Sequence, residues 1–176
     1  FAAYIGVTSL AGEEKNRTAE YLLTHPVSRS RIVSEKLLCI FCQILILNAV
    51  SILTSLIVVR AIGENLEMKE FFLLHAAYLL LQAEIAAVCF AISAALRRSG
   101  IGAGLGLAAI LYFLNIIANI TEDAEWLKYI TPFGYAEAAD IITNAEMDLL
   151  SAFIGCFVTA AAISAAFIIY NRKDIL

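Results

Sequence analysis

The chain alternates between long apolar runs and short polar connections. Four of the runs are about 20 residues or longer, which is enough for a helix to cross the ~30 Å hydrocarbon core of a bilayer. The runs are continuous and show no alternation of apolar and polar positions with a period of two, so the pattern predicts helices rather than barrel strands. They occupy residues 37–59, 71–96, 101–120 and 149–170.

Two further stretches complete the pattern. Residues 1–10 are apolar but too short to span a bilayer, so we interpret them as the end of a membrane helix. Residues 121–148 join the last two runs and contain apolar positions of their own. Thr121 is placed to cap a short helix there, and Pro132 to end it. We therefore expect one all-α polytopic domain, with four full membrane helices, the end of another, and an outer, partly helical lid or re-entrant segment.

Basic residues follow alternate connections of this pattern. They gather in residues 11–36, in the short link at 97–100 and after residue 170, whereas the other two connections are mostly acidic. Connections rich in Lys and Arg remain on the cytoplasmic side of a membrane. We therefore expect a multi-pass protein of a prokaryotic plasma membrane, with residues 11–36, the 97–100 link and the C-terminus in the cytoplasm.

The composition agrees with a membrane protein. Hydrophobic residues make up 61% of the 176 residues, charged residues make up 16%, and the mean hydropathy is +0.84. A single core in so short a chain does not bury that much apolar surface, which excludes a soluble enzyme. The net charge of -4 argues against nucleic-acid binding, which requires a basic face. All four cysteines fall within apolar runs, and we interpret them as small hydrophobic residues.

The sequence offers little to support catalytic or metal chemistry. His25 and His75 are the only histidines, and neither has neighbouring residues suited to bind a metal. An intramembrane protease needs two Asp, or a Ser with a base, at membrane depth, whereas Glu84 is the one ionisable residue near the middle of a run. We therefore expect no catalytic residue and no metal site.

Glu84 is the first candidate for a functional polar residue within the membrane. A charge at the bilayer centre costs about 2.5–3.5 kcal/mol on insertion scales, so such residues face protein or water. Two interpretations stay open: Glu84 borders a substrate pathway or a dimer seam, or it is a protonated side chain bonded to a neighbouring helix. Asn48, Asn115 and Asn119 are weaker candidates for the same pathway or seam, because helix packing explains most polar residues in such runs.

The segment from Glu13 to Lys36 carries a more specific signal. It resembles the permease subunit of type-2 ATP-binding cassette (ABC) transporters, which commonly show E-x-x-x-G-T-x-E-x-L-L-x-x-P-[VI]-[ST]-R before an apolar span that opens after a Lys. Arg17 stands where that pattern has Gly. The matching positions include Thr18, Glu20, Leu22, Leu23, Pro26, Val27, Ser28, Arg29 and Lys36.

This resemblance implies a fragment of a six-helix permease. In that family two permease chains pair as a homodimer or heterodimer in the lipid bilayer, and each docks on a separate cytoplasmic ATPase. ATP and Mg then belong to the ATPase, and the permease binds no cofactor of its own. The resemblance places the ATPase-coupling segment at residues 18–31, with Thr18, Glu20, Leu22, Leu23, Pro26, Val27, Ser28 and Arg29 as its contact residues.

The residues of this segment agree with a coupling role. Ala19, Leu22 and Leu23 share an apolar helical face, and Pro26 predicts a bend between two short helices. An amphipathic helix lying on anionic lipid explains the same pattern. The resemblance favours the subunit of an ATP-driven exporter. The alternatives are an ion-coupled carrier that uses Glu84, and a non-transporting membrane anchor or sensor.

Overall fold

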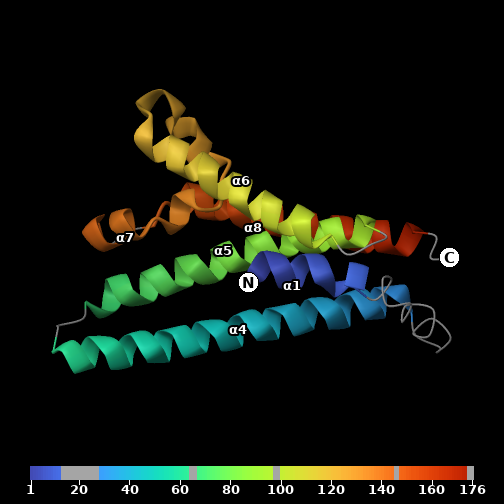
Figure 1. Ribbon diagram of the computed structural model, residues 1–176, viewed down its shortest axis with the longest axis horizontal. Helices are drawn as coiled ribbons and strands as arrows, with labels where there is room; N and C mark the ends of the chain where they lie inside the picture. Colours follow the sequence, from blue (N-terminus) through green and yellow to red (C-terminus); the bar gives the residue numbers. More distant parts are fainter. Residues whose placement is uncertain (13–27, 64–66, 97–99, 145–146, 174–176) are drawn as a thin grey trace.

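The computed structural model describes residues 1–12, 28–63, 67–96, 100–144 and 147–173 (Figure 1). All regular elements in these ranges are helices, and four of them are long and apolar enough to cross a membrane. The prediction of an all-α polytopic membrane protein is confirmed. In chain order the elements are α1 (Ala2–Ser9), α4 (Arg29–Ile62), α5 (Met68–Ala95), α6 (Ile101–Ile120), the 3₁₀ helices η1 (Glu122–Tyr129) and η2 (Gly134–Ala136), α7 (Ala138–Asn144) and α8 (Leu149–Arg172).

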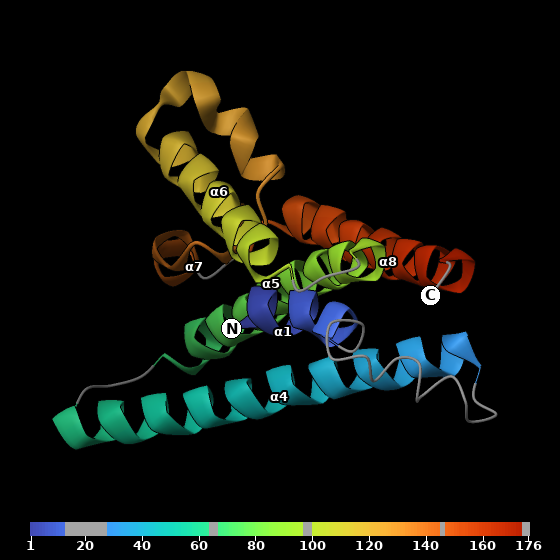
Figure 2. The ribbon, with the colours of Figure 1, turned by 45° about the vertical axis from the view of Figure 1, so that its right-hand side comes forward.

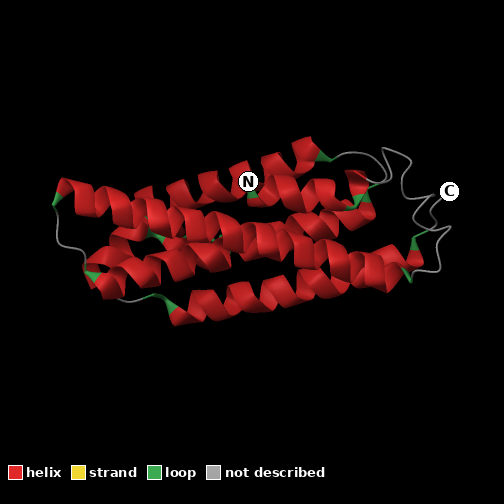
Figure 3. Ribbon diagram, turned by 90° about the horizontal axis from the view of Figure 1, so that it is seen from below, coloured by secondary structure: helices red, strands yellow, loops and turns green. Residues whose placement is uncertain are grey.

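Helix α5 occupies the centre of the bundle. It has the most buried residues of the four long helices, and its most extensive contacts are with α8 and α1. Helix α4 packs against α5 and α8 and runs along the lower edge of the view in Figure 1, and many of its large apolar side chains are exposed. Figure 3 shows that the described elements are all helical. Large exposed apolar side chains are expected on helices surrounded by lipid, because lipid gives them no reason to be buried in protein.

Helix α4 is longer than the apolar run from which it was predicted. It begins at Arg29 rather than at residue 37, because the Oγ of Ser28 accepts a hydrogen bond from the Arg31 N–H at 3.3 Å and caps the helix there. It ends at Ile62, where Gly63 adopts a left-handed conformation with φ of 79°. Hydropathy identifies only the part of a helix that lies in lipid, so it does not identify the polar first turns of α4.

Helix α1 packs into a notch between α5 and α6. A Cβ atom added to Gly6 would lie 2.5 Å from the Ala86 carbonyl oxygen and 2.9 Å from the Cys89 Cβ. A Cβ added to Gly104 of α6 would lie 2.7 Å from the Cγ1 of Val7. Glycines on both sides therefore let three helices approach closely, in the manner of small residues at membrane helix interfaces.

A buried serine fixes the end of α1. The Oγ of Ser93 in α5 accepts hydrogen bonds from the backbone N–H groups of Leu10 at 3.1 Å and Ala11 at 2.9 Å. Ser93 itself is fully buried. In this position one buried hydroxyl satisfies two backbone donors just beyond the end of α1.

Ser93→Ala should therefore cost about 1–2 kcal/mol of unfolding free energy, because it removes the shared acceptor of two backbone donors. Thermal unfolding in detergent micelles measures the loss. Ser164→Ala is the matched control, since Ser164 is exposed and its hydroxyl bonds only to the Ala160 carbonyl of its own helix. An equal change in both variants would contradict the role given to Ser93.

The connection between α6 and α8 is folded against the bundle. Helix η1 turns back along the end of α6 (Figure 2), and Thr131, Tyr135 and Ile141 beyond it are buried. The prediction that the Thr121 side chain caps a helix is wrong: it makes no capping bond to η1. Instead Thr121 closes α6, because its N–H donates to the Ile117 carbonyl at 3.0 Å.

Candidate functional site: the inner clasp and the buried carboxyl

Three parts of the chain meet at the end of the bundle where α4 begins and α5 and α8 end. Arg29 reaches from the first turn of α4 to the end of α8, where its Nη1 donates to the Lys173 carbonyl at 2.5 Å and lies 3.4 Å from the Asn171 carbonyl. The Nζ of Lys173 donates to the Leu96 carbonyl at 2.5 Å, beyond the end of α5. We call the set Arg29, Ser30, Leu96, Asn171 and Lys173 the inner clasp.

Ser30 and Asn171 complete the inner clasp. The Nδ2 of Asn171 lies 3.1 Å from the Ser30 Oγ, and the Ser30 Oγ lies 3.3 Å from the Asn171 Oδ1. Helical carbonyls at a C-terminus lack partners within the helix, so the Arg29 guanidinium satisfies groups that α8 leaves open. The start of α4 is therefore tied to the ends of both α8 and α5.

The inner clasp lies next to the coupling segment predicted from the sequence. Two of the predicted contact residues belong to the described structure: Ser28 caps α4, and Arg29 is in the clasp. The described structure begins again at Ser28, so residues 18–27 of the predicted segment are separated by a single residue from a joint between three membrane helices. The remaining predicted contact residues lie outside the described residues: Thr18, Glu20, Leu22, Leu23, Pro26 and Val27.

A second polar group lies inside the bundle, at Glu84 of α5. The Tyr135 hydroxyl donates to the Glu84 Oε2 at 2.9 Å, and both side chains are buried. Burial, reinforced by the neighbouring carboxyl, raises the pKa of Tyr135, so the hydroxyl keeps the proton that it donates. The bond joins α5 to the outer connection at η2.

Gly155 of α8 makes room for this pair. A Cβ atom added to Gly155 would lie 2.5 Å from the Glu84 Oε2 and 3.1 Å from the Tyr135 Cε1. The carboxyl of Glu84 is therefore enclosed by α5, η2 and α8. The sequence left two interpretations of Glu84 open. This geometry agrees with the second one, in which the side chain is bonded to a neighbouring element. The prediction that Glu84 borders a pathway or a dimer seam remains a prediction.

The three asparagines have different surroundings. The Nδ2 of Asn48 in α4 donates to the Gln82 Oε1 of α5 at 3.0 Å, so it joins two membrane helices. Asn115 and Asn119 in α6 both face the outer connection. Thr131 lies 3.5 Å from the Asn115 Oδ1, and the Nδ2 of Asn119 donates to Glu137 at 2.8 Å. Within this chain, Asn115 and Asn119 therefore join α6 to the residues just after η1 and η2.

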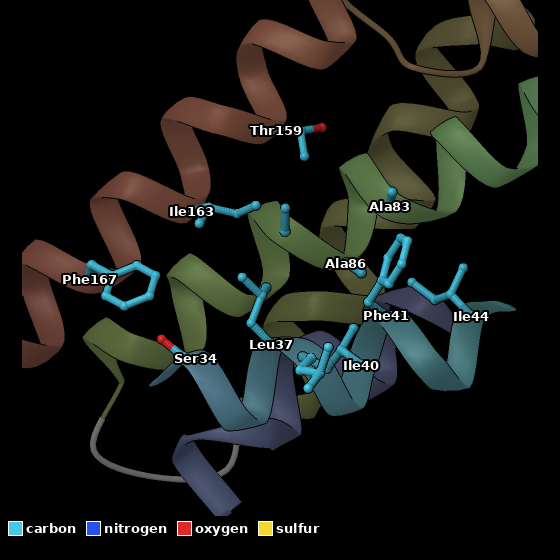
Figure 4. A pocket seen from close by; sticks show the side chains of 12 residues that line it. Ser34, Leu37, Ile40, Phe41, Ile44, Ala83, Ala86, Thr159, Ile163 and Phe167 are labelled. Carbon is cyan, nitrogen blue, oxygen red and sulfur yellow. The ribbon is translucent and has the colours of Figure 1, made fainter. Parts of the chain in front are cut away.

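An open apolar groove of about 420 Å³ lies between α4, α5 and α8 (Figure 4). Alanines of α5 form its floor, and larger apolar side chains of α4 and α8 form its walls. A smaller hollow of about 220 Å³ continues towards Tyr135 and Gly155, and it shares three lining residues with the groove. These shared residues are Ala83, Thr159 and Ile163.

The sequence analysis identified Glu84, Asn48 and Arg29 but not the residues to which they bond. No role was predicted for Tyr135, which lies within the outer connection at residues 121–148. Asn171 was read as part of a cytoplasmic end, and Gln82 was not considered. For Glu84 a bond to a neighbouring helix was one of the two interpretations, whereas its partner is a hydroxyl from the outer connection, 51 positions away.

The fold and these contacts define a multi-pass helical membrane protein whose membrane helices are joined, at one end, to the segment that follows residue 27. Comparison with family profiles matches residues 1–175 to the ABC-2 family transporter protein. The chain belongs to this family and is a membrane permease of an ABC transport system, a class of subunit that works with an ABC ATPase. Comparisons with curated proteins and with solved structures give no match.

Proposed function

We propose that this chain forms part of the membrane pathway of an ATP-driven exporter. It pairs with a second permease chain, and residues 18–31 dock on a separate cytoplasmic ATPase, which holds ATP and Mg and carries out hydrolysis. The chain has no catalytic role of its own. The proposal places the inner clasp on the cytoplasmic side, in agreement with the basic residues at that end.

One observation carries the coupling part of this proposal. Arg29 and Ser30, which follow the docking segment directly, bond to the end of α8, and Lys173 bonds on to the end of α5. A displacement of the docking segment is therefore passed to three membrane helices together rather than lost in a loose linker. Coupling between distant sites needs such a chain of packed and bonded elements.

The alternative of an ion-coupled carrier has less support. Such a carrier needs a carboxyl that exchanges cations with water, whereas the Glu84 carboxyl is enclosed between helices and accepts a hydrogen bond from Tyr135. This arrangement suits a fixed contact between α5, α8 and the outer connection.

Leu23→Asp tests the docking segment. It should reduce co-purification of the partner ATPase by at least about tenfold, because an aspartate buried in the contact loses its hydration without gaining a partner. Insertion into the membrane should be unchanged. Ile62→Asp is the control, because Ile62 is exposed at the opposite end of α4. ATPase recovery that stays the same after Leu23→Asp would refute the placement of the docking segment.

A further inference from the structure

The apolar groove between α4, α5 and α8 spans about half of the membrane. From Ser34 to Ile44 its α4 wall covers eleven residues, a rise of about 15 Å along an α-helix. The hydrocarbon core of a bilayer is ~30 Å thick. The groove starts one helical turn from the inner clasp, with Ser34 and Phe167 at that end (Figure 4). It therefore matches the depth of a single leaflet.

The lining of the groove is suited to a hydrocarbon chain. Only two of its residues, Ser34 and Thr159, carry a polar side chain. Both hydroxyls donate to carbonyls of their own helix, Ser34 to Ser30 at 2.9 Å and Thr159 to Gly155 at 2.8 Å. A polar ligand would lose hydration in this groove and gain few hydrogen bonds in return. A flexible apolar chain meets no such penalty.

The end of the groove at the inner clasp is polar and basic. The Ser30–Asn171 contact joins α4 to α8 one helical turn beyond Ser34. Arg29, Arg31 and Arg172 lie within one turn of this contact, and among the residues that the structure describes there, Glu35 is the acidic neighbour and pairs with Arg31. An anionic group positioned there would lie at the membrane surface, where each Lys or Arg attracts anionic lipid.

We propose that this groove is a binding site for an anionic phospholipid. One acyl chain lies between α4 and α8 on the alanine floor of α5, and the phosphate lies against the arginines beside the inner clasp. The length of the groove favours a lipid over a second copy of this chain, because a membrane helix of a partner would cover both leaflets. The proposal does not depend on docking of the ATPase.

Photo-crosslinking in nanodiscs tests the proposal. The full-length protein is placed in phosphatidylcholine that contains a small fraction of phosphatidylglycerol with a diazirine on its acyl chain. We expect crosslinks on groove residues such as Phe41 and Ile163, and we expect unlabelled phosphatidylglycerol to compete better than extra phosphatidylcholine. Crosslinks spread evenly over all exposed apolar residues, or crosslinks to a second copy in the groove, would overturn the proposal.

Paired variants separate the chain site from the headgroup site. Thr159→Phe fills the groove and should reduce groove crosslinks by at least about fivefold, whereas Ala161→Phe, on an exposed position of the same helix, should not. Arg31→Gln and Arg172→Gln should each reduce the preference for phosphatidylglycerol by about fivefold. Arg60→Gln, at the opposite end of α4, should leave it unchanged. Equal effects of Arg31→Gln and Arg60→Gln would overturn the headgroup assignment.

Discussion

Gly6→Leu should detach α1 from α5 and destabilise the protein by at least about 3 kcal/mol. A Cβ at this position would lie 2.5 Å from the Ala86 carbonyl oxygen, which belongs to the backbone of the central helix and has no freedom to move away. The remaining atoms of leucine would also meet the buried Phe90, since its backbone nitrogen lies 3.2 Å from the same Cβ position.

The apparent melting temperature in detergent micelles measures this effect. For a chain of this size, 3 kcal/mol corresponds to a decrease of roughly 6–12 °C. Gly106→Leu is the matched control, because a Cβ at Gly106 meets nothing within 4 Å. Leucine is also the better helix former, so this control should be neutral or slightly stabilising. Similar melting temperatures for the two variants would contradict the close approach of α1 and α5.

Tyr135→Phe should cost roughly 2–3 kcal/mol, because it leaves the enclosed Glu84 carboxyl without the hydroxyl that donates to it. The ring is kept, so the packing of η2 against α5 and α8 is unchanged and the loss reports the hydrogen bond. The outer connection should also become more accessible to protease, because this bond is its link to the middle of α5.

A double-mutant cycle with Glu84→Gln separates this bond from other effects. The amide oxygen of Gln still accepts a hydrogen bond, so Glu84→Gln alone should be milder than Tyr135→Phe, and the two changes should not add. Tyr129→Phe is the control, since Tyr129 lies half-exposed in the same outer connection and should change stability by less than about 0.5 kcal/mol. Additive losses at Glu84 and Tyr135 would show that the two side chains do not act together.

The membrane helices were predictable because hydropathy depends only on the local sequence. Each of the four apolar runs became one helix, and the alternation of basic connections agrees with the inner clasp, where residues after α5 and α8 meet the start of α4. Hydropathy does not show which glycines of α6 pack closely: Gly104 packs against α1, whereas Gly102 meets nothing within 4 Å.

The contacts that complete the site were not predictable, because each depends on how far a connection folds back. Glu84 was found from its place within an apolar run, but no local pattern shows that the segment after Pro132 reaches it. The bonds of Arg29 depend on the crossing of α4 and α8, which hydropathy does not determine. Gln82 pairs with Asn48 across two helices for the same reason.

The inner clasp also sets an order for biosynthesis. Arg29 and Lys173 are 144 positions apart, so the start of α4 leaves the ribosome long before its partner is made. Until α8 has been inserted, the guanidinium lacks the carbonyls to which it bonds in the folded chain. Synthesis that stops before α8 therefore leaves the start of α4 unbonded, and this end of α4 becomes fixed only once α8 is in place.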